Sequence, residues 1–424
     1  MMLMLHPLLI GIVITMQHRL AQLLLASSSP AASSPLFLAY AFSPSTTRQA
    51  FSNRRRLLSI MSSSTDTAAG TSKLQYIDAG ANLLDSMYQG VYHGKERHDP
   101  DLDIVLARAH QKGVDRIISM AGTPKECEET LDLIEKLDKE CEGSDKTERV
   151  KVFGTVGVHP TRCAEVFAKS SSSGDGDDEE ERVWEPKTEE EQTQIISRMI
   201  DLINRGKKSG NVIAVGEFGL DYARLHFCPK DIQQLGFRKQ LDMAIETQLP
   251  LYLHNRDSGE DLYSILLDYR DRLVASQGGE DGNICGVVHS FDESIEVAAK
   301  LMSLGLHIGI NGCSLKTPEN LQTVEQIPLE KLILETDCPW CDIRPTHAGH
   351  EHLHTMFPTK KEKQYNRELA KDFCVKNRTE PCHVAQVAEV IAGVKGVDVG
   401  EVVAASNRNV HQVFGNLQKV KIDS

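Results

Sequence analysis

Four potential metal ligands follow short apolar runs in widely separated parts of the chain: Glu217, His254, His289 and Asp337. Runs such as VIAV (212–215) and LYL (251–253) are typical of strands buried on both faces of a parallel sheet. A polar ligand type at the end of each of four such strands is unusual for a core. Neutral imidazole and carboxylate together suit Zn, Mn, Co, Mg or Fe(II) without choosing among them. The pattern therefore predicts a divalent metal site at the C-terminal ends of parallel strands.

Apolar runs alternate with amphipathic segments from Leu74 onward, which predicts an α/β fold of the (β/α)8 TIM-barrel type. An open doubly wound sheet would alternate in the same way, but no glycine-rich phosphate loop follows the first strand. The expected strands are Gln75–Asp78, Arg116–Met120, Val150–Val158, Val212–Val215, Pro250–Leu253, Gly286–Val288, Leu306–Ile310 and Lys331–Glu335. The expected helices are Leu102–Lys112, Glu126–Lys139, Gln192–Lys207, Asp231–Thr247, Ser258–Arg272, Ser294–Leu304, Pro318–Gln326, His383–Ala392 and Val399–Phe414.

Composition limits the classes of protein that this chain can belong to. The formal net charge of −13 argues against holding nucleic acid by bulk positive charge, although a metal and a few local cations could still meet phosphates. No run reaches the ~18 apolar residues that a membrane span requires. The 10 cysteines are scattered rather than regularly spaced, which favours free thiols in a reducing compartment.

Two segments differ from the rest in composition. Residues 1–65 contain no Asp or Glu but several Arg and many Ser, which is typical of organelle transit peptides. We expect a disordered leader over residues 1–73 that targets a mitochondrion or plastid, or else a start at Met61 and a cytoplasmic or nuclear protein. Residues 74–424 form a single expected catalytic domain, with a Ser/Gly-rich and acidic loop insertion at about 170–187.

Seven motifs occur in order along the chain and resemble those of the TatD family of metal-dependent deoxyribonucleases, most closely its eukaryotic branch. They are VGVHP (156–160), VGEFGLD (215–221), LYLHNRDS (251–258), VVHSFD (287–292), IGINGCSLKT (308–317), LILETDCPW (332–340) and TEPCH (379–383). The similarity extends from about Leu74 to Phe414. The family belongs to the wider superfamily of metal-dependent hydrolases built on this barrel.

The resemblance implies that Glu217, His254, His289 and Asp337 bind one or two divalent ions, with Mg, Mn and Zn as the candidates. Glu217 would bridge two ions, and Asp337 would also accept a proton from the attacking water. The family places His159 over the substrate phosphate or in proton transfer. The implied activity is hydrolysis of DNA, by a 3′–5′ exonuclease acting on single strands or 3′ ends, in DNA repair or DNA catabolism.

Three further side chains are candidates for holding phosphate oxygens. Arg256, Asn311 and Lys316 come just after the fifth and seventh expected strands, where donors would face the same rim. Ordinary surface or loop-capping roles are the alternative for each of them.

The first expected strand departs from the superfamily pattern. Many relatives carry Asp-x-His-x-His there, whereas this chain has Asp78, Gly80 and Asn82 at the corresponding positions. Asn82 offers one amide oxygen and Gly80 offers no side-chain ligand, so Asp78 and Asn82 are predicted to be weaker metal ligands. We therefore expect that a second ion binds weakly or arrives with the substrate.

Two other functions use the same barrel. One is hydrolysis of small esters or amides, including deacylation of aminoacyl-tRNA, against which stand the missing His-x-His and the glutamate at strand four. The other is a non-catalytic binding protein, which would need an incomplete ligand set. The intact set of Glu217, His254, His289 and Asp337 favours the enzyme.

Overall fold

Eight parallel strands form the centre of the computed structural model, which describes residues 74–140, 149–170, 183–278, 282–415 and 417. Each strand pairs with its neighbours in chain order, and the last returns to the first through a parallel bridge between Ala81 and Cys338. The strands are β1 (Tyr76–Ala81), β4 (Val114–Ser119), β5 (Lys151–Val156), β8 (Val212–Asp221), β9 (Leu251–Arg256), β10 (Gly286–His289), β11 (His307–Ile310) and β12 (Leu332–Leu334). The predicted (β/α)8 barrel is confirmed.

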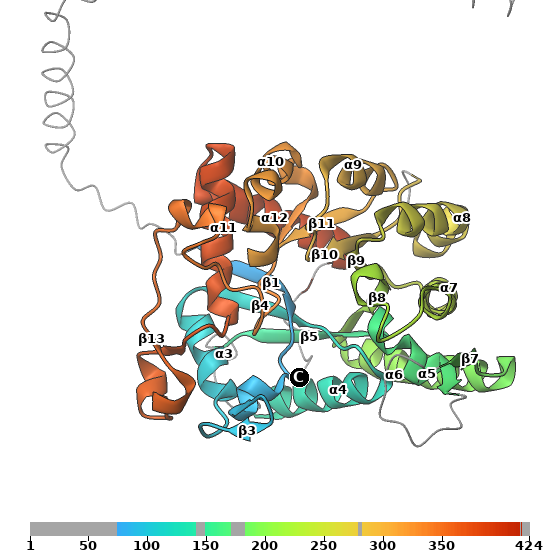
Figure 1. Cartoon of the computed structure of the whole chain (residues 1–424), viewed down its shortest axis with the longest axis horizontal. Helices are drawn as coiled ribbons and strands as arrows, with labels where there is room; N and C mark the ends of the chain where they lie inside the picture. Colours follow the sequence, from blue (N-terminus) through green and yellow to red (C-terminus); the bar gives the residue numbers. More distant parts are fainter. Residues whose placement is uncertain (1–73, 141–148, 171–182, 279–281, 416, 418–424) are drawn as a thin grey trace, which may run out of the picture. The chain divides into compact units, whose positions relative to one another are not determined.

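Helices surround the strands, and those from α3 to α10 follow one another around the sheet in chain order (Figure 1). The longer ones are α3 (Leu102–Gln111), α4 (Pro124–Lys139), α6 (Glu189–Ser209), α7 (Lys230–Thr247), α8 (Gly259–Gln277), α9 (Ile295–Ser303), α10 (Pro318–Gln326), α11 (Val384–Lys395) and α12 (Val399–Phe414). Each expected helix is therefore present, with ends shifted by a few residues. The short helix α5 (Cys163–Phe167) was not expected.

Two strands that carry predicted ligands extend further than expected. The expected fourth strand ends at Val215, but β8 continues to Asp221 and carries Glu217 inside it. The fifth likewise continues past His254 as β9. The predicted ends of these two strands, Val215 and Leu253, are therefore wrong, and Glu217 and His254 lie within β8 and β9. Glycine interrupts the apolar pattern without ending the pairing, and a Cβ on Gly219 would lie only 2.0 Å from the His254 carbonyl oxygen.

The buried side chains fill two layers, one inside the barrel and one between strands and helices. Side chains such as Ile77, Ile118, Phe153 and Val287 form the inner cluster, together with the end of α12. The larger cluster joins the outward-facing strand residues to the helices. This rigid frame fixes the strand ends that carry the candidate ligands.

Two expected segments lie outside the part of the chain that the structure describes: the predicted leader, residues 1–73, and most of the acidic insertion, residues 171–182. The described flanks of the insertion form a two-stranded antiparallel ribbon, β6 (Ala168–Ser170) with β7 (Trp184–Pro186). Two more pairs of short strands flank the barrel, β2 (Val91–Tyr92) with β3 (Lys95–Glu96) and β13 (Thr359–Lys360) with β14 (Cys374–Val375).

Across the described residues, no helix is long and apolar enough to cross a membrane.

Candidate metal centre

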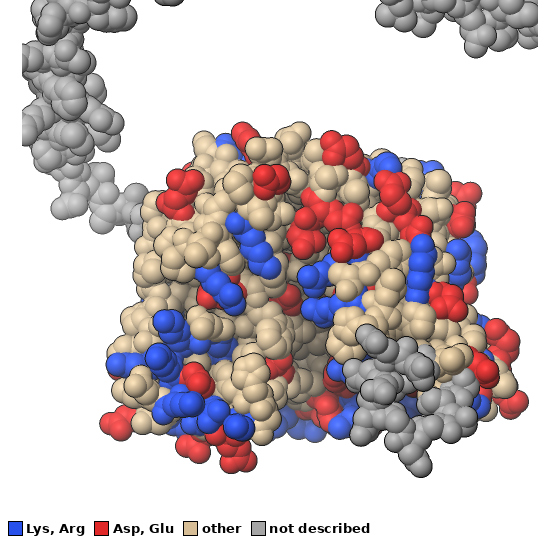
Figure 2. Space-filling model, viewed as in Figure 1, with Lys and Arg blue, Asp and Glu red and all other residues tan. Residues whose placement is uncertain are grey.

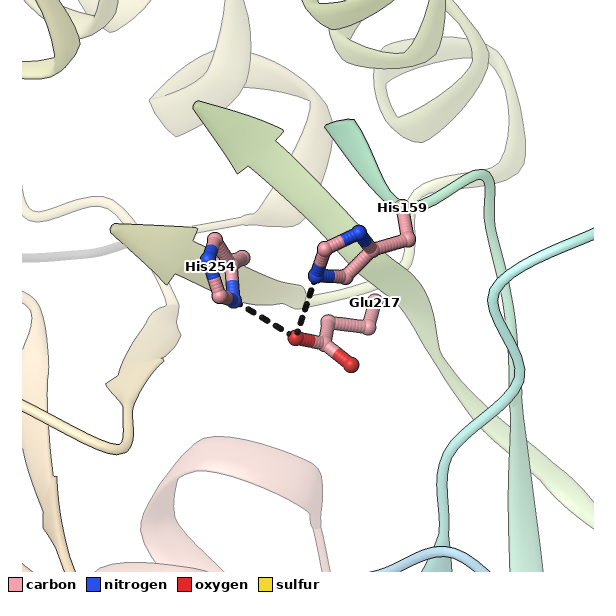
Figure 3. A group of neighbouring side chains, drawn as sticks. All are labelled: His159, Glu217 and His254. Atoms are coloured by element: carbon pink, nitrogen blue, oxygen red, sulfur yellow. Dashed lines mark hydrogen bonds and ion pairs between the residues drawn. The ribbon is translucent and has the colours of Figure 1, made fainter. Parts of the chain in front are cut away.

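One carboxylate oxygen, Oε1 of Glu217, is the point at which three imidazoles meet. His289 Nε2 lies 2.6 Å from it, His254 Nδ1 lies 2.8 Å from it, and His159 Nε2 lies 3.5 Å from it. Figure 3 shows His159 and His254 pointing from different parts of the barrel toward this oxygen. The ligand atoms of His159, Glu217 and His254 lie within 4.8 Å of one another.

The strand register brings these residues together. In the parallel ladder, His254 of β9 stands opposite Gly219 of β8 on one side and His289 of β10 on the other. Glu217 is two residues before Gly219, so all three ligands emerge at the same level of the barrel mouth. Residues far apart in sequence become neighbours because the carboxyl ends of parallel strands share one rim.

Asp337 completes the predicted set on the last strand's side of the mouth. Its carboxylate accepts a hydrogen bond from Asn82 Nδ2 at 2.9 Å and lies 3.3 Å from Cys341 Sγ. Its backbone nitrogen donates to the Gly80 carbonyl at 2.8 Å, which ties this loop to β1. Asp337 lines the same cavity as Glu217. The four predicted ligands are thus placed around one space.

The electrostatics of this cluster fit a divalent cation. Burial acts to raise the pKa of Glu217, yet the adjacent imidazole of His289 and the hydrogen bond from His254 hold it well below its usual range. Burial lowers the pKa of His289, but Glu217 outweighs that and raises it well above its usual range. The buried carboxylate therefore requires positive charge beside it. A divalent ion would supply that charge, and mixed imidazole and carboxylate donors are the set that such ions bind.

Two buried carboxylates that were not predicted support the histidines from behind. Asp221 Oδ2 lies 3.3 Å from His254 Nε2, and Glu335 Oε1 lies 3.7 Å from His289 Nδ1. Glu335 is further held by the Ser290 backbone nitrogen at 2.5 Å. Metal-binding histidines commonly have such an outer carboxylate, which fixes the ring and its tautomer. Both residues belong to the motifs VGEFGLD and LILETDCPW, but the sequence does not indicate toward which side of its strand an acidic side chain points.

We expect Asp221→Asn to weaken metal binding without unfolding the barrel. Loss of the charge behind His254 should reduce affinity for Mn²⁺ roughly 10- to 100-fold, the usual effect of removing an outer-shell carboxylate. Isothermal titration of the metal-stripped protein measures this. The control Asp268→Asn removes an exposed carboxylate on α8, whose side chain is 66 % exposed. If the two variants bound Mn²⁺ with equal affinity, Asp221 would make no contribution to metal binding.

The first strand does not supply the weak ligands that were predicted. Asp78 is fully buried, and its two oxygens accept hydrogen bonds from the nitrogen and hydroxyl of Thr336 at 2.8 and 2.7 Å. It therefore joins β1 to β12 and does not line the cavity. Asn82 does line the cavity, but its amide nitrogen is the group that contacts Asp337. A Cβ on Gly80 would lie 2.4 Å from the Tyr252 hydroxyl, so no side chain fits there.

The cavity around Glu217 measures about 840 Å³ and contains cationic side chains. Arg256 and Lys316 line it as predicted, and Arg224 lines it although the sequence analysis missed that residue. Asn311 does not line it. The side chain of Asn311 is buried and donates to Ser290 Oγ at 2.9 Å, so the substrate-binding role predicted for it does not fit.

Charged side chains of both signs lie on the face that Figure 2 draws. Lys and Arg gather toward the lower left of that view and Asp and Glu above its centre, with some of each sign elsewhere. Because the whole chain has a net charge of −13, attraction of a phosphate to the cavity depends on the cations that line it.

A second group of metal-ligand types is buried beside α3, consisting of Cys374, Glu380 and Cys382. The Glu380 carboxylate already pairs with the guanidinium groups of Arg108 and Arg378. Two fixed positive charges beside the group disfavour a further cation, so we interpret it as part of the core.

Comparison with known proteins agrees with this geometry. The family model of the TatD-related DNases matches residues 77–415. The deoxyribonuclease Tat-D of Schizosaccharomyces pombe is 38 % identical over 329 residues, which cover 77 % of this chain and 92 % of that protein. The 3′–5′ ssDNA/RNA exonuclease TatD of Erwinia tasmaniensis is 25 % identical over 343 residues, 80 % of this chain and 98 % of that protein. The crystal structure of a TatD-family hydrolase from Entamoeba histolytica superposes with a TM-score of 0.66 at 30 % identity, covering 82 % of this chain and all of that one.

Proposed function

Because the chain belongs to the family of TatD-related DNases, a family of hydrolases acting on phosphodiester bonds, we propose that it is a metal-dependent 3′–5′ exodeoxyribonuclease. The observation that carries the proposal is the convergence of His254, His289 and His159 on Glu217, beside the cations of the cavity. The bacterial relative named as a 3′–5′ exonuclease supports the direction of cleavage.

Glu217, His254, His289 and Asp337 would hold the divalent ion or ions, of which Mg, Mn and Zn are the candidates. The chemistry that such an ion supplies when bound is polarisation of the phosphoryl oxygen and activation of a water molecule. The side chains Asp221 and Glu335 would keep the two histidine rings in place.

His159 is suited to hold a phosphate oxygen of the substrate. Its Nδ1 accepts a hydrogen bond from the Thr161 backbone nitrogen at 3.2 Å. Burial lowers the pKa of His159 to about 3, so the ring is neutral and its one proton is on Nε2. That N–H points toward Glu217 and the cavity, where it can donate to the scissile phosphate.

Asp337 is suited to accept a proton from the attacking water. Burial raises the pKa of Asp337 to about 6, so the carboxylate is ionised at neutral pH and is still basic enough to take a proton. Arg224, Arg256 and Lys316 line the same cavity and provide donors for the remaining phosphate oxygens.

The direction of cleavage is tested by a time course on one single-stranded oligonucleotide carrying ³²P either within its last 3′ nucleotide or at its 5′ end. We expect the 3′-labelled strand to release a labelled mononucleotide from the first minutes. The 5′-labelled strand should shorten as a ladder. Labelled products of intermediate length that appear from the 5′-labelled strand before products shortened by one or two nucleotides would overturn the exonuclease and indicate an endonuclease.

The same purified protein should be assayed on lactones and aminoacyl esters. Hydrolysis of these with no hydrolysis of DNA would favour the ester or amide hydrolase instead.

We propose that the nuclease acts in DNA repair or DNA catabolism, and that the expected leader directs it to an organelle. Imaging of the full-length protein fused to a C-terminal fluorophore, beside a version that starts at Met61, tests the second point.

A further inference from the structure

Two aromatic side chains, Trp340 and Phe227, are exposed to solvent inside the cavity that holds Glu217. Their exposed fractions are 50 % and 51 %. Every other Phe or Trp in the described residues is buried or half-buried. Large apolar side chains exposed at the edge of a polar cavity mark a binding surface, because leaving them in water is unfavourable. The two exposed aromatics therefore coincide with the proposed active site, although they come from different loops.

Short turns place both rings beside the reactive groups. The Trp340 backbone nitrogen donates to the Asp337 carbonyl at 3.0 Å, so the ring stands one turn after a proposed metal ligand. The Phe227 backbone nitrogen donates to the Arg224 carbonyl at 3.1 Å, and Arg224 also lines the cavity. The Phe227 ring packs on His226 with centroids 4.2 Å apart.

A smaller cavity of about 360 Å³ adjoins the first and shares Glu217, His159 and Trp340 with it. Trp340 therefore lies where the two cavities meet, whereas Phe227 lines only the larger one. A strand whose scissile phosphate lies at Glu217 would extend into both cavities. The bases next to that phosphate would then reach the two rings.

Phosphate contacts alone are a limited source of affinity here. The larger cavity has Arg224, Arg256 and Lys316 but also Asp292. The smaller one has Arg162 and Arg224 but also Asp85, Glu126 and Glu129. The whole chain carries a net charge of −13. Proteins that bind single strands add affinity by stacking bases on aromatic rings, an interaction open to every base once it is unpaired.

We propose that Trp340 and Phe227 stack on the unpaired bases that flank the scissile phosphate, and that these two rings supply a large part of the affinity for the DNA strand. The inference rests on the proposed nuclease function and names two residues that bind the bases of its substrate. Bases inside a duplex are already stacked on their neighbours, so a duplex end has to fray before it can engage the rings.

The test compares Trp340→Ala and Phe227→Ala with the unaltered protein on a 5′-labelled single strand with a free 3′ end. We expect KM to rise about 5- to 100-fold for each variant, with kcat little changed, because each lost stacking interaction weakens binding of the strand. Trp340→Phe should restore most of the affinity. Leu267→Ala, which removes an exposed apolar side chain on α8, is the matched control and should leave KM unchanged.

A second substrate separates stacking from a structural role. An otherwise identical strand whose last three nucleotides lack bases should be cleaved with the same KM by both alanine variants and by the unaltered protein. Equal losses on the normal and base-free strands, or unchanged KM on both, would overturn the stacking proposal. An unaltered protein that cleaves neither strand would instead overturn the nuclease function itself.

Discussion

Glu217→Gln should reduce kcat/KM on single-stranded DNA by at least about 1,000-fold, equivalent to about 4 kcal/mol of transition-state stabilisation. Glutamine keeps the shape of the side chain but removes the charge on which His254 and His289 converge at 2.8 and 2.6 Å. Without that carboxylate the site loses the oxygen that lies closest to three imidazoles. The measurement combines steady-state kinetics with the metal content of the purified variant.

The fold should survive this change, because Glu217 is held by the site and not by the hydrophobic clusters. Glu260→Gln serves as the control, since its side chain is 70 % exposed on α8 and should leave both activity and metal content unchanged. If Glu217→Gln retained more than a tenth of the activity with full metal content, the carboxylate would have no part in catalysis.

Arg378→Met should lower the free energy of unfolding by about 3–5 kcal/mol, the usual cost of removing one partner from a buried ion pair. Arg378 and Asp101 have side chains that are 1 % and 0 % exposed, and they pair through two hydrogen bonds of 2.9 and 2.6 Å. The guanidinium also contacts Glu380 at 3.0 Å. Methionine fills most of the volume but leaves two buried carboxylates without this partner.

This network joins α3 to the segment after the last strand, because Arg108 of α3 pairs with Glu380. The same segment is tied to the loop that carries Asp337, since the Thr379 backbone nitrogen donates to the Pro339 carbonyl at 3.0 Å. Chemical denaturation measures the loss. The matched control is Arg272→Met, which breaks an ion pair whose side chains are 57 % and 47 % exposed and should cost no more than about 1 kcal/mol. If both variants lost the same free energy of unfolding, the buried network would stabilise the fold no more than an exposed ion pair does.

The sequence predicts the barrel because alternation of apolar runs and amphipathic segments is a property of each element on its own. It also brings the four ligands together, because residues that end parallel strands must share one rim. His159 follows the same logic at the end of β5. These predictions need only local patterns and one rule of topology.

Contacts between elements are what the sequence does not show. Asp78 carries a ligand type, yet its oxygens are used by Thr336 across the seam of the barrel. Asn311 likewise turns inward to Ser290 and Glu335. Asp221 and Glu335 support the histidines through side-chain directions that only the assembled strands define. A strand's apolar pattern says which residues are buried, but not which buried residue faces the mouth.

The most direct test of the metal centre uses protein from which a chelator has removed the metal and dialysis has then removed the chelator. The measurement is its rate of single-stranded DNA hydrolysis. Stripped protein should show no hydrolysis above background, and adding back Mn²⁺, Mg²⁺ or Zn²⁺ should restore the activity with at least one of them. Undiminished hydrolysis by protein shown to contain no metal would contradict the assignment of Glu217, His254, His289 and Asp337 as a metal site.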